Sequence, residues 1–276
     1  MTSLGQTLVN LERFIRNAGE EPQWLSYVYR ELKVLTLTDF YTSLRQDITP
    51  SDEALLQEIA KRLANHEPAQ YILGYEYFGN LRISVDRRVL IPRPETLELV
   101  EWVLTRESGT KQVLDLGTGS GAIAISLKKA KPDWQISASD ISEDALLLAK
   151  ENADRHHLAI TFCQSDVFDS MKGYYDVIIA NPPYIALSDI AEVSQNVLAF
   201  EPHLALFAKE EGLAIYRKIL AGLTEHLTPN GALYLEIGYK QGKSIQKLVS
   251  ELLPGFSILT KVDSYGKDRM VVITRD

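Results

Sequence analysis

Cysteine is almost absent from this sequence: Cys163 is the only one among 276 residues. A single thiol excludes an intrachain disulfide, and a chain without disulfides suits a reducing compartment. Cys163 ends the apolar run 160–163, where a buried structural thiol is a better interpretation than a nucleophile. We therefore expect a cytoplasmic protein whose chemistry does not depend on cysteine.

Long apolar runs are also missing, and so is an N-terminal signal that begins basic and continues apolar. A helix that crosses a bilayer needs roughly 20 consecutive apolar residues, so we expect no membrane partner. The five histidines have no spacing typical of a metal site, and we expect no metal.

Basic residues do not outnumber acidic ones: 29 lysines and arginines face 37 aspartates and glutamates, for a net charge of −8. A protein that neutralises many phosphates needs a basic face, so this balance counts against DNA as the main substrate. An acidic protein can still carry a local basic patch, but we expect no direct nucleic-acid partner. Nothing suggests a coiled coil, and we expect a monomer.

The chain is long enough for one large domain or two modest ones, and it has the composition of a soluble globular protein, with 45% hydrophobic and 24% charged residues. Apolar side chains recur at helical spacing through residues 1–67, for example at Leu4, Leu8 and Leu11. Thr49 before Pro50 is typical of a helix N-cap with proline at the first helical position. We predict a helical bundle over 1–67, which either docks a protein partner or serves only as a packing appendage.

The pattern changes to aromatic and β-branched residues from Gln70 to Ile91, with Gly79-Asn80 as a turn signal. This pattern predicts a β-hairpin connector over residues 68–92. Pro94 can then begin a helix, and the last domain would span 93–276.

Strands and helices alternate from residue 112 onward. The expected strands are 113–116, 134–139, 160–164, 175–180 and 232–237, the expected helices are 122–131, 143–153, 213–226 and 240–253, and the segments 256–261 and 270–274 would form a hairpin. Such alternation predicts an α/β fold with a mostly parallel sheet covered by helices on both faces.

Asn181-Pro182-Pro183-Tyr184 follows the apolar run 175–180, which is typical of a buried parallel strand. Two prolines cannot continue a sheet, and they leave a stiff loop whose carbonyls are free to accept. The amide oxygen of Asn181, the carbonyl of Pro182 and the ring of Tyr184 together suit a flat –NH2 group. The alternatives are a strand-end cap for Asn181 and ordinary packing for Tyr184.

A glycine loop, Gly117-Thr118-Gly119-Ser120-Gly121, lies between the first expected strand of this domain and its helix. Glycine lets the backbone approach a ligand closely, and the helix N-terminus presents unpaired N–H groups. Asp140 ends the second strand, where a carboxylate can accept both hydroxyls of a ribose. Asp166 follows the third strand and could reach an adenine amino group, with Phe168 against the ring. Each could also be a loop carboxylate or a core residue, but their places at successive strand ends favour a nucleoside site.

These residues carry a resemblance. The segment 113–126 with Asp140 and Asp166 resembles the S-adenosylmethionine site of Rossmann-like methyltransferases, and Asn181-Pro182-Pro183-Tyr184 resembles the [N/D]-P-P-[Y/F/W] motif of amino-group methyltransferases. Ile91-Pro92-Arg93-Pro94-Glu95-Thr96, Phe200-Glu201-Pro202 and the N-terminal helices narrow the resemblance to the PrmC/HemK family. Its members are protein-(glutamine-N5) methyltransferases that modify class I peptide-chain release factors. One variation is Ala199, where relatives often have arginine.

The resemblance implies a Rossmann-like methyltransferase fold: a mostly parallel seven-stranded sheet with an antiparallel C-terminal strand, joined by a β-hairpin to a small helical domain. It implies S-adenosylmethionine as methyl donor and the glutamine of a Gly-Gly-Gln motif as acceptor. The catalytic residues would be Asn181, Pro182 and Tyr184; the cofactor-binding residues Gly117, Thr118, Gly119, Ser120, Gly121, Asp140, Asp166, Phe168, Asn181, Arg93, Pro94, Glu95 and Thr96; and the substrate-binding residues Asn181, Pro182, Pro183, Tyr184 and Glu201.

Two other functions stay open at this point. The same four residues could hold the conjugated –NH2 of a DNA or RNA adenine, although such an enzyme needs base flipping and phosphate contacts. A non-catalytic docking protein with a vestigial nucleoside site is the third possibility, against which the intact glycine loop, Asp140 and Asn181 argue.

Overall fold

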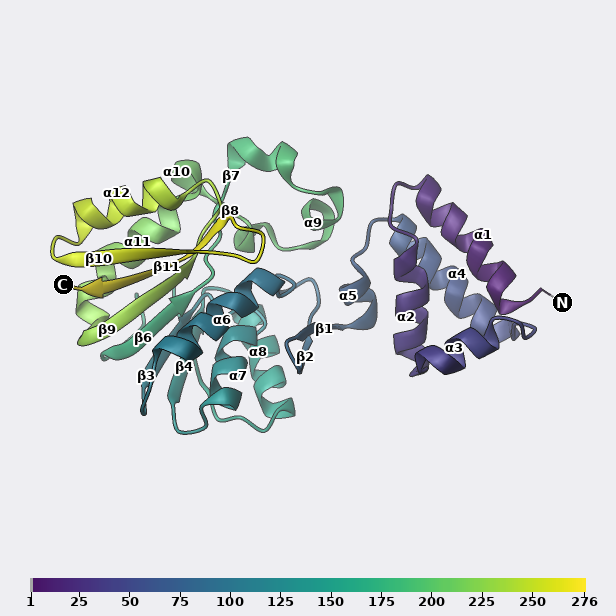
Figure 1. The fold of residues 1–276 in the computed structure, drawn as a ribbon, viewed down its shortest axis with the longest axis horizontal. Helices are drawn as coiled ribbons and strands as arrows, with labels where there is room; N and C mark the ends of the chain where they lie inside the picture. Colours follow the sequence, from purple (N-terminus) through teal and green to yellow (C-terminus); the bar gives the residue numbers. More distant parts are fainter. Residues whose placement is uncertain (1) are drawn as a thin grey trace. The chain divides into compact units, whose positions relative to one another are not determined.

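The computed structural model describes residues 2–276, which divide into two compact units (Figure 1). Unit 1 contains the chain up to Tyr75 together with Val193–Phe200, and unit 2 contains Glu76–Glu192 and Glu201–Asp276. Within residues 2–276, every helix is too short or too polar to cross a membrane.

Unit 1 is built from helices around one apolar core. Ser3, Thr36 and Thr49 cap three of them, each accepting from the backbone N–H three residues on, and the cap predicted at Thr49 is confirmed. The helices of its N-terminal segment are α1 Leu4–Asn17, α2 Gln23–Lys33, α3 Leu37–Ser43, α4 Pro50–Ala64 and α5 Ala69–Leu73. Leu25 and Leu56 are fully buried between them. Whether this unit docks a partner stays a prediction.

The β structure expected from residue 70 is wrong for Ala69–Leu73, which form α5. Ala69 and Ile72 are buried in the core of unit 1, and this packing outweighs the local preference of aromatic and β-branched residues for strands. The left-handed backbone of Gly74 ends the helix. The hairpin itself is confirmed: β1 Tyr75–Phe78 and β2 Leu81–Ser84 form a two-stranded sheet around Gly79-Asn80.

Unit 2 contains a seven-stranded sheet in the order β10-β11-β9-β6-β3-β4-β5. The strands are β3 Gln112–Leu116, β4 Gln135–Asp140, β5 Thr161–Gln164, β6 Tyr175–Ala180, β9 Leu227–Glu236, β10 Phe256–Val262 and β11 Asp268–Arg275. β11 is antiparallel to both of its neighbours, and β9, β6, β3, β4 and β5 are mutually parallel. The predicted mostly parallel sheet, its antiparallel C-terminal strand and the terminal hairpin are therefore confirmed.

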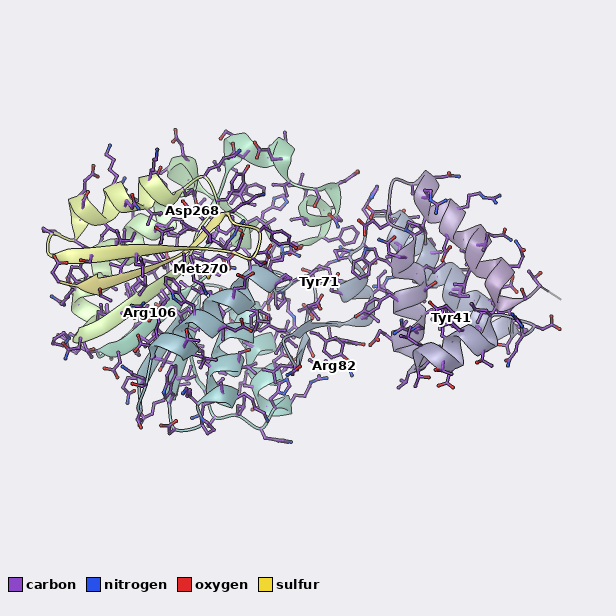
Figure 2. The ribbon with its side chains drawn as sticks, in the orientation of Figure 1. Tyr41, Tyr71, Arg82, Arg106, Asp268 and Met270 are labelled. Carbon is purple, nitrogen blue, oxygen red and sulfur yellow. The ribbon has the colours of Figure 1, made fainter. Side chains whose placement is uncertain are left out.

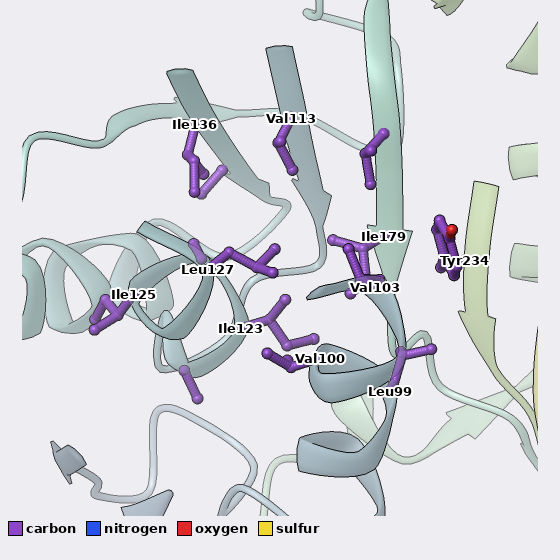
Figure 3. Packing of buried hydrophobic residues seen from close by; sticks show 14 of the residues in the cluster. Leu99, Val100, Val103, Val113, Ile123, Ile125, Leu127, Ile136, Ile179 and Tyr234 are labelled. Carbon is purple, nitrogen blue, oxygen red and sulfur yellow. The ribbon is translucent and has the colours of Figure 1, made fainter. Parts of the chain in front are cut away.

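Helices cover both faces of this sheet because consecutive residues of each central strand, which point to opposite faces, are apolar. Val113, Ile179 and Tyr234 face α6 and α7 in one cluster (Figure 3), whereas Leu114 and Ile178 pack with α11 and α12 in a second. The helices are α6 Pro94–Arg106, α7 Ala122–Ala130, α8 Glu143–Arg155, α11 Ala214–His226 and α12 Gly242–Leu252. Figure 2 shows the density of side chains across the sheet, with Met270 of β11 fully buried.

Short elements connect β6 to α11. They are β7 Ile185–Ala186, the 3-10 helix η1 Leu187–Glu192, α9 Gln195–Phe200, the 3-10 helix η2 His203–Ala205, β8 Phe207–Ala208 and α10 Lys209–Gly212. β7 and β8 pair in parallel as a separate two-stranded sheet. Glu210, Glu211 and Gly212 all have left-handed backbones, so α10 is a tight turn rather than a regular helix.

The direction of the strand order reverses at β3, which lies between β4 and β6. Leu116 of β3 pairs with Ala180 of β6, so Gly117 and Asn181 leave the sheet side by side at the carboxyl ends of the two strands. Ligands of open α/β sheets bind at such a reversal point. The topology therefore brings the glycine loop and the asparagine-proline loop to one place.

Candidate active site

A cavity of about 590 Å³ opens at this edge of the sheet. Its lining includes the segments 117–120, 140–142, 165–167 and 181–183, which follow β3, β4, β5 and β6 in turn. Arg93 and Thr96 line it from the start of α6. The cavity thus collects residues that the sequence placed at four successive strand ends.

The glycine loop takes a shape that only glycine adopts easily. Gly117, Gly119 and Gly121 have φ values of 70°, 53° and 82°. A Cβ on Gly121 would also lie 3.2 Å from the Cβ of Ala149, so a side chain there would press against α8. The loop leads into the N-terminus of α7, whose first N–H groups have no partner within the helix.

Asp115 holds this loop in position through hydrogen bonds, a role that the sequence did not predict. Its side chain is fully buried, and Oδ2 accepts hydrogen bonds from Thr118 Oγ1 at 2.6 Å and from the backbone N–H of Ala124 at 3.2 Å. Burial raises the pKa of Asp115 to about 7. Its position in an apolar strand could have predicted this role, because burying a carboxylate costs free energy unless hydrogen bonds compensate for it.

Asp140 lies where a ribose-binding carboxylate was expected. Oδ2 accepts from the backbone N–H of Gly119 and Oδ1 from that of Ser142, both at 2.9 Å. Burial raises its pKa, and the bonds from backbone N–H groups oppose that rise. An ionised carboxylate has about four acceptor sites, which the backbone N–H groups of Gly119, Ser142 and Ile141 do not exhaust, so acceptor capacity remains for hydroxyl groups in the cavity. The donor set therefore fits a ribose.

Asp166 and Phe168 separate in the structure. Asp166 lines the cavity and pairs with Lys218, whose Nζ lies 2.9 Å from its Oδ2. Phe168 is buried in the second core cluster and stacks on His226 with centroids 4.5 Å apart. Val167, with a left-handed φ of 56°, turns the chain so that Val167 lines the cavity in its place. The expectation that Phe168 lies against an adenine ring is not supported by this position.

Asn181 is held by its amide nitrogen. Nδ2 donates to Thr96 Oγ1 at 2.9 Å, and Thr96 Oγ1 donates to Glu236 Oε2 at 2.6 Å. No residue of the described chain donates to Asn181 Oδ1. Because Asn181 lines the cavity with Pro182 and Pro183, its oxygen is available to accept a hydrogen bond from a bound group.

Tyr184 is positioned through its backbone. Its carbonyl accepts from Gln241 Nε2 at 3.0 Å, and Gln241 Oε1 accepts from the N–H of Gly238 at 3.0 Å. Burial raises the pKa of the Tyr184 hydroxyl well above its ordinary value, so the phenol stays neutral. Unlike the two prolines before it, Tyr184 is not part of the cavity lining.

Glu201, which was expected to bind substrate, is not among the residues that line the cavity. Its side chain is only 1% exposed and forms an ion pair with Arg93, while its Oε2 accepts from the N–H of Ile91 at 3.1 Å. Both oxygens are therefore engaged by the chain itself, and Glu201 positions the segment before α6. Of that segment, Arg93 and Thr96 line the cavity; Pro94 and Glu95 form the first turn of α6 outside it.

Sequence reasoning also missed Glu236 and Gln241. Glu236 lies inside the apolar segment 232–237, and a carboxylate in such a segment is the same signal that marks Asp115. Gln241 carried no signal, because its partners are backbone groups, one of Gly238 nearby and one of Tyr184 57 residues away. Across residues 2–276, no cluster of three or more His, Cys, Asp or Glu side chains is arranged to hold a metal ion.

Two protein-family models match the chain. The PrmC N-terminal domain matches residues 6–74, and the methyltransferase small domain matches residues 96–204. The second match covers the strand ends that line the cavity from Gly117 to Pro183.

Full-length relatives are close. The chain is 50% identical to a release factor glutamine methyltransferase of Streptococcus pneumoniae over 98% of each chain. It is 47% identical to a protein of the same name from Lactococcus lactis, over 92% of this chain and 94% of that one. Among solved structures, a methyltransferase from Pyrococcus furiosus superposes with a TM-score of 0.55 at 20% identity, covering 71% of this chain and 88% of that one, which shows a shared fold.

Proposed function

This chain belongs to the release factor glutamine methyltransferase family, and from that membership we propose that it methylates the side-chain amide nitrogen (N5) of a glutamine in class I peptide-chain release factors. The methyl donor is S-adenosylmethionine, and the acceptor is the glutamine of a Gly-Gly-Gln motif. One observation carries the proposal: a strand-end amide whose oxygen is free faces the same cavity as the glycine loop and Asp140.

The nucleoside part of the donor fits the edge formed by β3, β4 and β5. Asp140 would accept the ribose hydroxyls, and the loop 117–121 lets the backbone approach closely. Asp166, paired with Lys218, has acceptor capacity left for an adenine amino group. When bound, S-adenosylmethionine supplies a methyl group on a positively charged sulfur, which is a strong electrophile.

The amide end of the cavity would hold the acceptor. A primary amide nitrogen is a poor nucleophile because its lone pair is delocalised into the carbonyl. Asn181 Oδ1 and the Pro182 carbonyl would each accept one N–H, which orients the nitrogen and favours the positive charge that develops on it. Fixed orientation of two reactants can supply up to about 7–11 kcal/mol of a barrier, so positioning without a dedicated base is a sufficient role for these residues.

The proposal is tested by a transfer assay with labelled S-adenosylmethionine, purified class I release factor and, in parallel, duplex DNA. We expect one methyl group on the glutamine of the Gly-Gly-Gln loop, located by mass spectrometry, and no label on DNA. The Asn181→Ala variant should lose transfer at least about 100-fold while its affinity for S-adenosylmethionine changes little, because it lacks only an acceptor for the amide. Label on DNA adenine alone, or full turnover by Asn181→Ala, would refute the assignment.

A further inference from the structure

A chain of three side chains links Asn181 to a buried carboxylate. Asn181 Nδ2 donates to Thr96 Oγ1, and Thr96 Oγ1 donates to Glu236 Oε2. Thr96, in the first turn of α6, is 5% exposed, and Glu236, at the carboxyl end of β9, is 2% exposed. We refer to these three residues as the relay.

The polarity of the relay is fixed at its buried end. An ionised carboxylate can only accept, so the single hydrogen of the Thr96 hydroxyl is directed to Glu236. Thr96 Oγ1 is then left with lone pairs and must receive a donor from its other neighbour. Asn181 meets that demand only with its NH2 group, because its carbonyl oxygen has no hydrogen to donate.

This constraint matters because the two ends of an asparagine amide have nearly the same shape. Packing alone selects poorly between them, and the hydrogen-bond partners decide which end points where. With NH2 on Thr96, the oxygen is the end left for the cavity. The opposite orientation would present the Asn181 NH2 group to the NH2 group of the acceptor amide, so that two donors would face each other.

We propose that Glu236 is a positioning residue for methyl transfer: acting through Thr96, it makes the Asn181 oxygen, rather than its NH2 group, the end that meets the acceptor amide. The importance of this orientation for turnover rests on the function proposed above, whereas the orientation itself does not. Neither Thr96 nor Glu236 needs to touch the substrate for this role.

The surroundings of Glu236 make the relay sensitive to protons. Burial raises its pKa to about 7, although Arg269 of β11 and Arg93 before α6 favour the ionised form. Glu95, also in α6, has the opposite effect and raises the pKa further. The Tyr184 hydroxyl, whose own pKa is raised, stays neutral at this pH.

Two contacts limit how strongly the surroundings stabilise the Glu236 carboxylate. The Tyr216 hydroxyl of α11 donates to the backbone carbonyl of Glu236, not to its carboxylate. Arg269 is shared with Asp263, whose Oδ2 lies 3.1 Å from its Nε.

Protonation would reverse the relay. A neutral Glu236 can donate to Thr96 Oγ1, whose own hydrogen then turns toward Asn181 and selects its oxygen. The NH2 group of Asn181 would then face the acceptor. Transfer should therefore be highest above pH 7, where Glu236 is ionised, and fall with a one-proton dependence as the pH decreases through about 7.

Kinetics with release factor test the consequence. Thr96→Val removes the hydroxyl at nearly constant volume, and we expect kcat at saturating S-adenosylmethionine to fall about tenfold, the bias that one ordinary hydrogen bond provides. Thr96→Ser should restore kcat to within about threefold of wild type because it returns the hydroxyl. Glu236→Gln cannot titrate, so its pH profile should lack the fall near pH 7.

Asp115 provides the competing explanation for that fall, because its pKa is also raised to about 7. If Glu236→Gln keeps the fall, Glu236 is not its source and the inference is overturned. The inference is also overturned if Thr96→Val has the same kcat as the wild-type protein. If Glu236→Gln does not fold, the pair Thr96→Val and Thr96→Ser still decides.

A nuclear magnetic resonance measurement tests the orientation without any substrate. The side-chain NH2 of Asn181, labelled with 15N and assigned by its loss in Asn181→Asp, should exchange with solvent more slowly in wild type than in Thr96→Val. Equal exchange rates in the two proteins would overturn the inference. If the wild-type protein methylates no release factor but shows the protected NH2, the proposed function fails and the orientation stands.

Discussion

Gly212 lies directly behind the loop that carries Tyr184, and a single methyl group there should damage catalysis. Its φ of 82° ends the left-handed turn of α10. A Cβ added at this position would lie 2.1 Å from the carbonyl oxygen of Tyr184 and 2.7 Å from Gln241 Nε2. The first of these atoms belongs to the backbone and cannot rotate away.

Two costs of Gly212→Ala follow, and they can be separated. The left-handed backbone costs an alanine about 1–2 kcal/mol, which lowers stability. Contacts of a real Cβ stay above 3.0 Å, so the Tyr184 peptide must also move by about 1 Å. Pro182 is two residues away, and a misplacement of about 1 Å in groups that position a reactant costs about 100-fold in rate.

Gly255→Ala is the matched control. Gly255 has nearly the same φ, 85°, but nothing lies within 4 Å of its Cβ position. We expect Gly255→Ala to lose about 1–2 kcal/mol of unfolding free energy in urea titrations and Gly212→Ala to lose more, because its clash with the Tyr184 backbone adds to the cost of the left-handed conformation. Only Gly212→Ala should also lose about 100-fold in kcat at saturating S-adenosylmethionine. Equal kcat values for the two variants would show that the Gly212 contact does not set the position of the asparagine-proline loop.

Two further predictions concern the cofactor edge and the segment before α6. Asp140→Ala should weaken S-adenosylmethionine binding about 10- to 100-fold, measured by calorimetry, because hydrogen bonds to a charged acceptor are lost. Asp133 is an exposed carboxylate, and Asp133→Ala should leave binding unchanged. Equal affinities of these two variants would contradict the assignment of Asp140 to the ribose. Glu201→Ala should lower the free energy of unfolding by about 1–3 kcal/mol because Ile91 N–H and Arg93 lose a buried acceptor. Glu201→Gln should lower it less. An unchanged urea midpoint in both variants would show that the contacts of Glu201 with Ile91 and Arg93 do not contribute to stability.

Most of the fold follows from local patterns in the sequence. The apolar run 175–180 and the glycine loop are contiguous signals, and both lie where the sequence predicts. Ala69–Leu73 departs from expectation because its partners in the unit 1 core are distant in the sequence. Where local preference and tertiary packing disagree, short segments follow the packing.

The site residues also fall into those that local sequence patterns predict and those that depend on distant contacts. Asp140 and Asn181 could be located because Asp140 ends one strand and Asn181 directly follows another, and the carboxyl ends of parallel strands share one edge. The partners of Thr96 could not, because Glu236 is 140 residues away and meets it only through the order of β6 and β9 in the sheet. Phe168 lies in the core while Val167 lines the cavity, and the left-handed conformation of Val167, which is rare for a β-branched residue, is a feature that the sequence pattern does not reveal.

The position of β11 has a consequence for how the protein is made. This strand is the last in the chain, yet it lies between β9 and β10, with Met270 opposite Glu236 and the N–H of Ile237 bonded to Arg269. During synthesis the chain emerges from its N-terminus, so β9 must wait for residues 268–275 before its open edge is paired. A nascent chain that already contains the glycine loop and Asn181 therefore lacks the strand that pairs beside Glu236. Loss of residues 268–276 would remove that strand and Arg269, although the glycine loop, Asp140, Asn181 and Glu236 would all remain in the sequence.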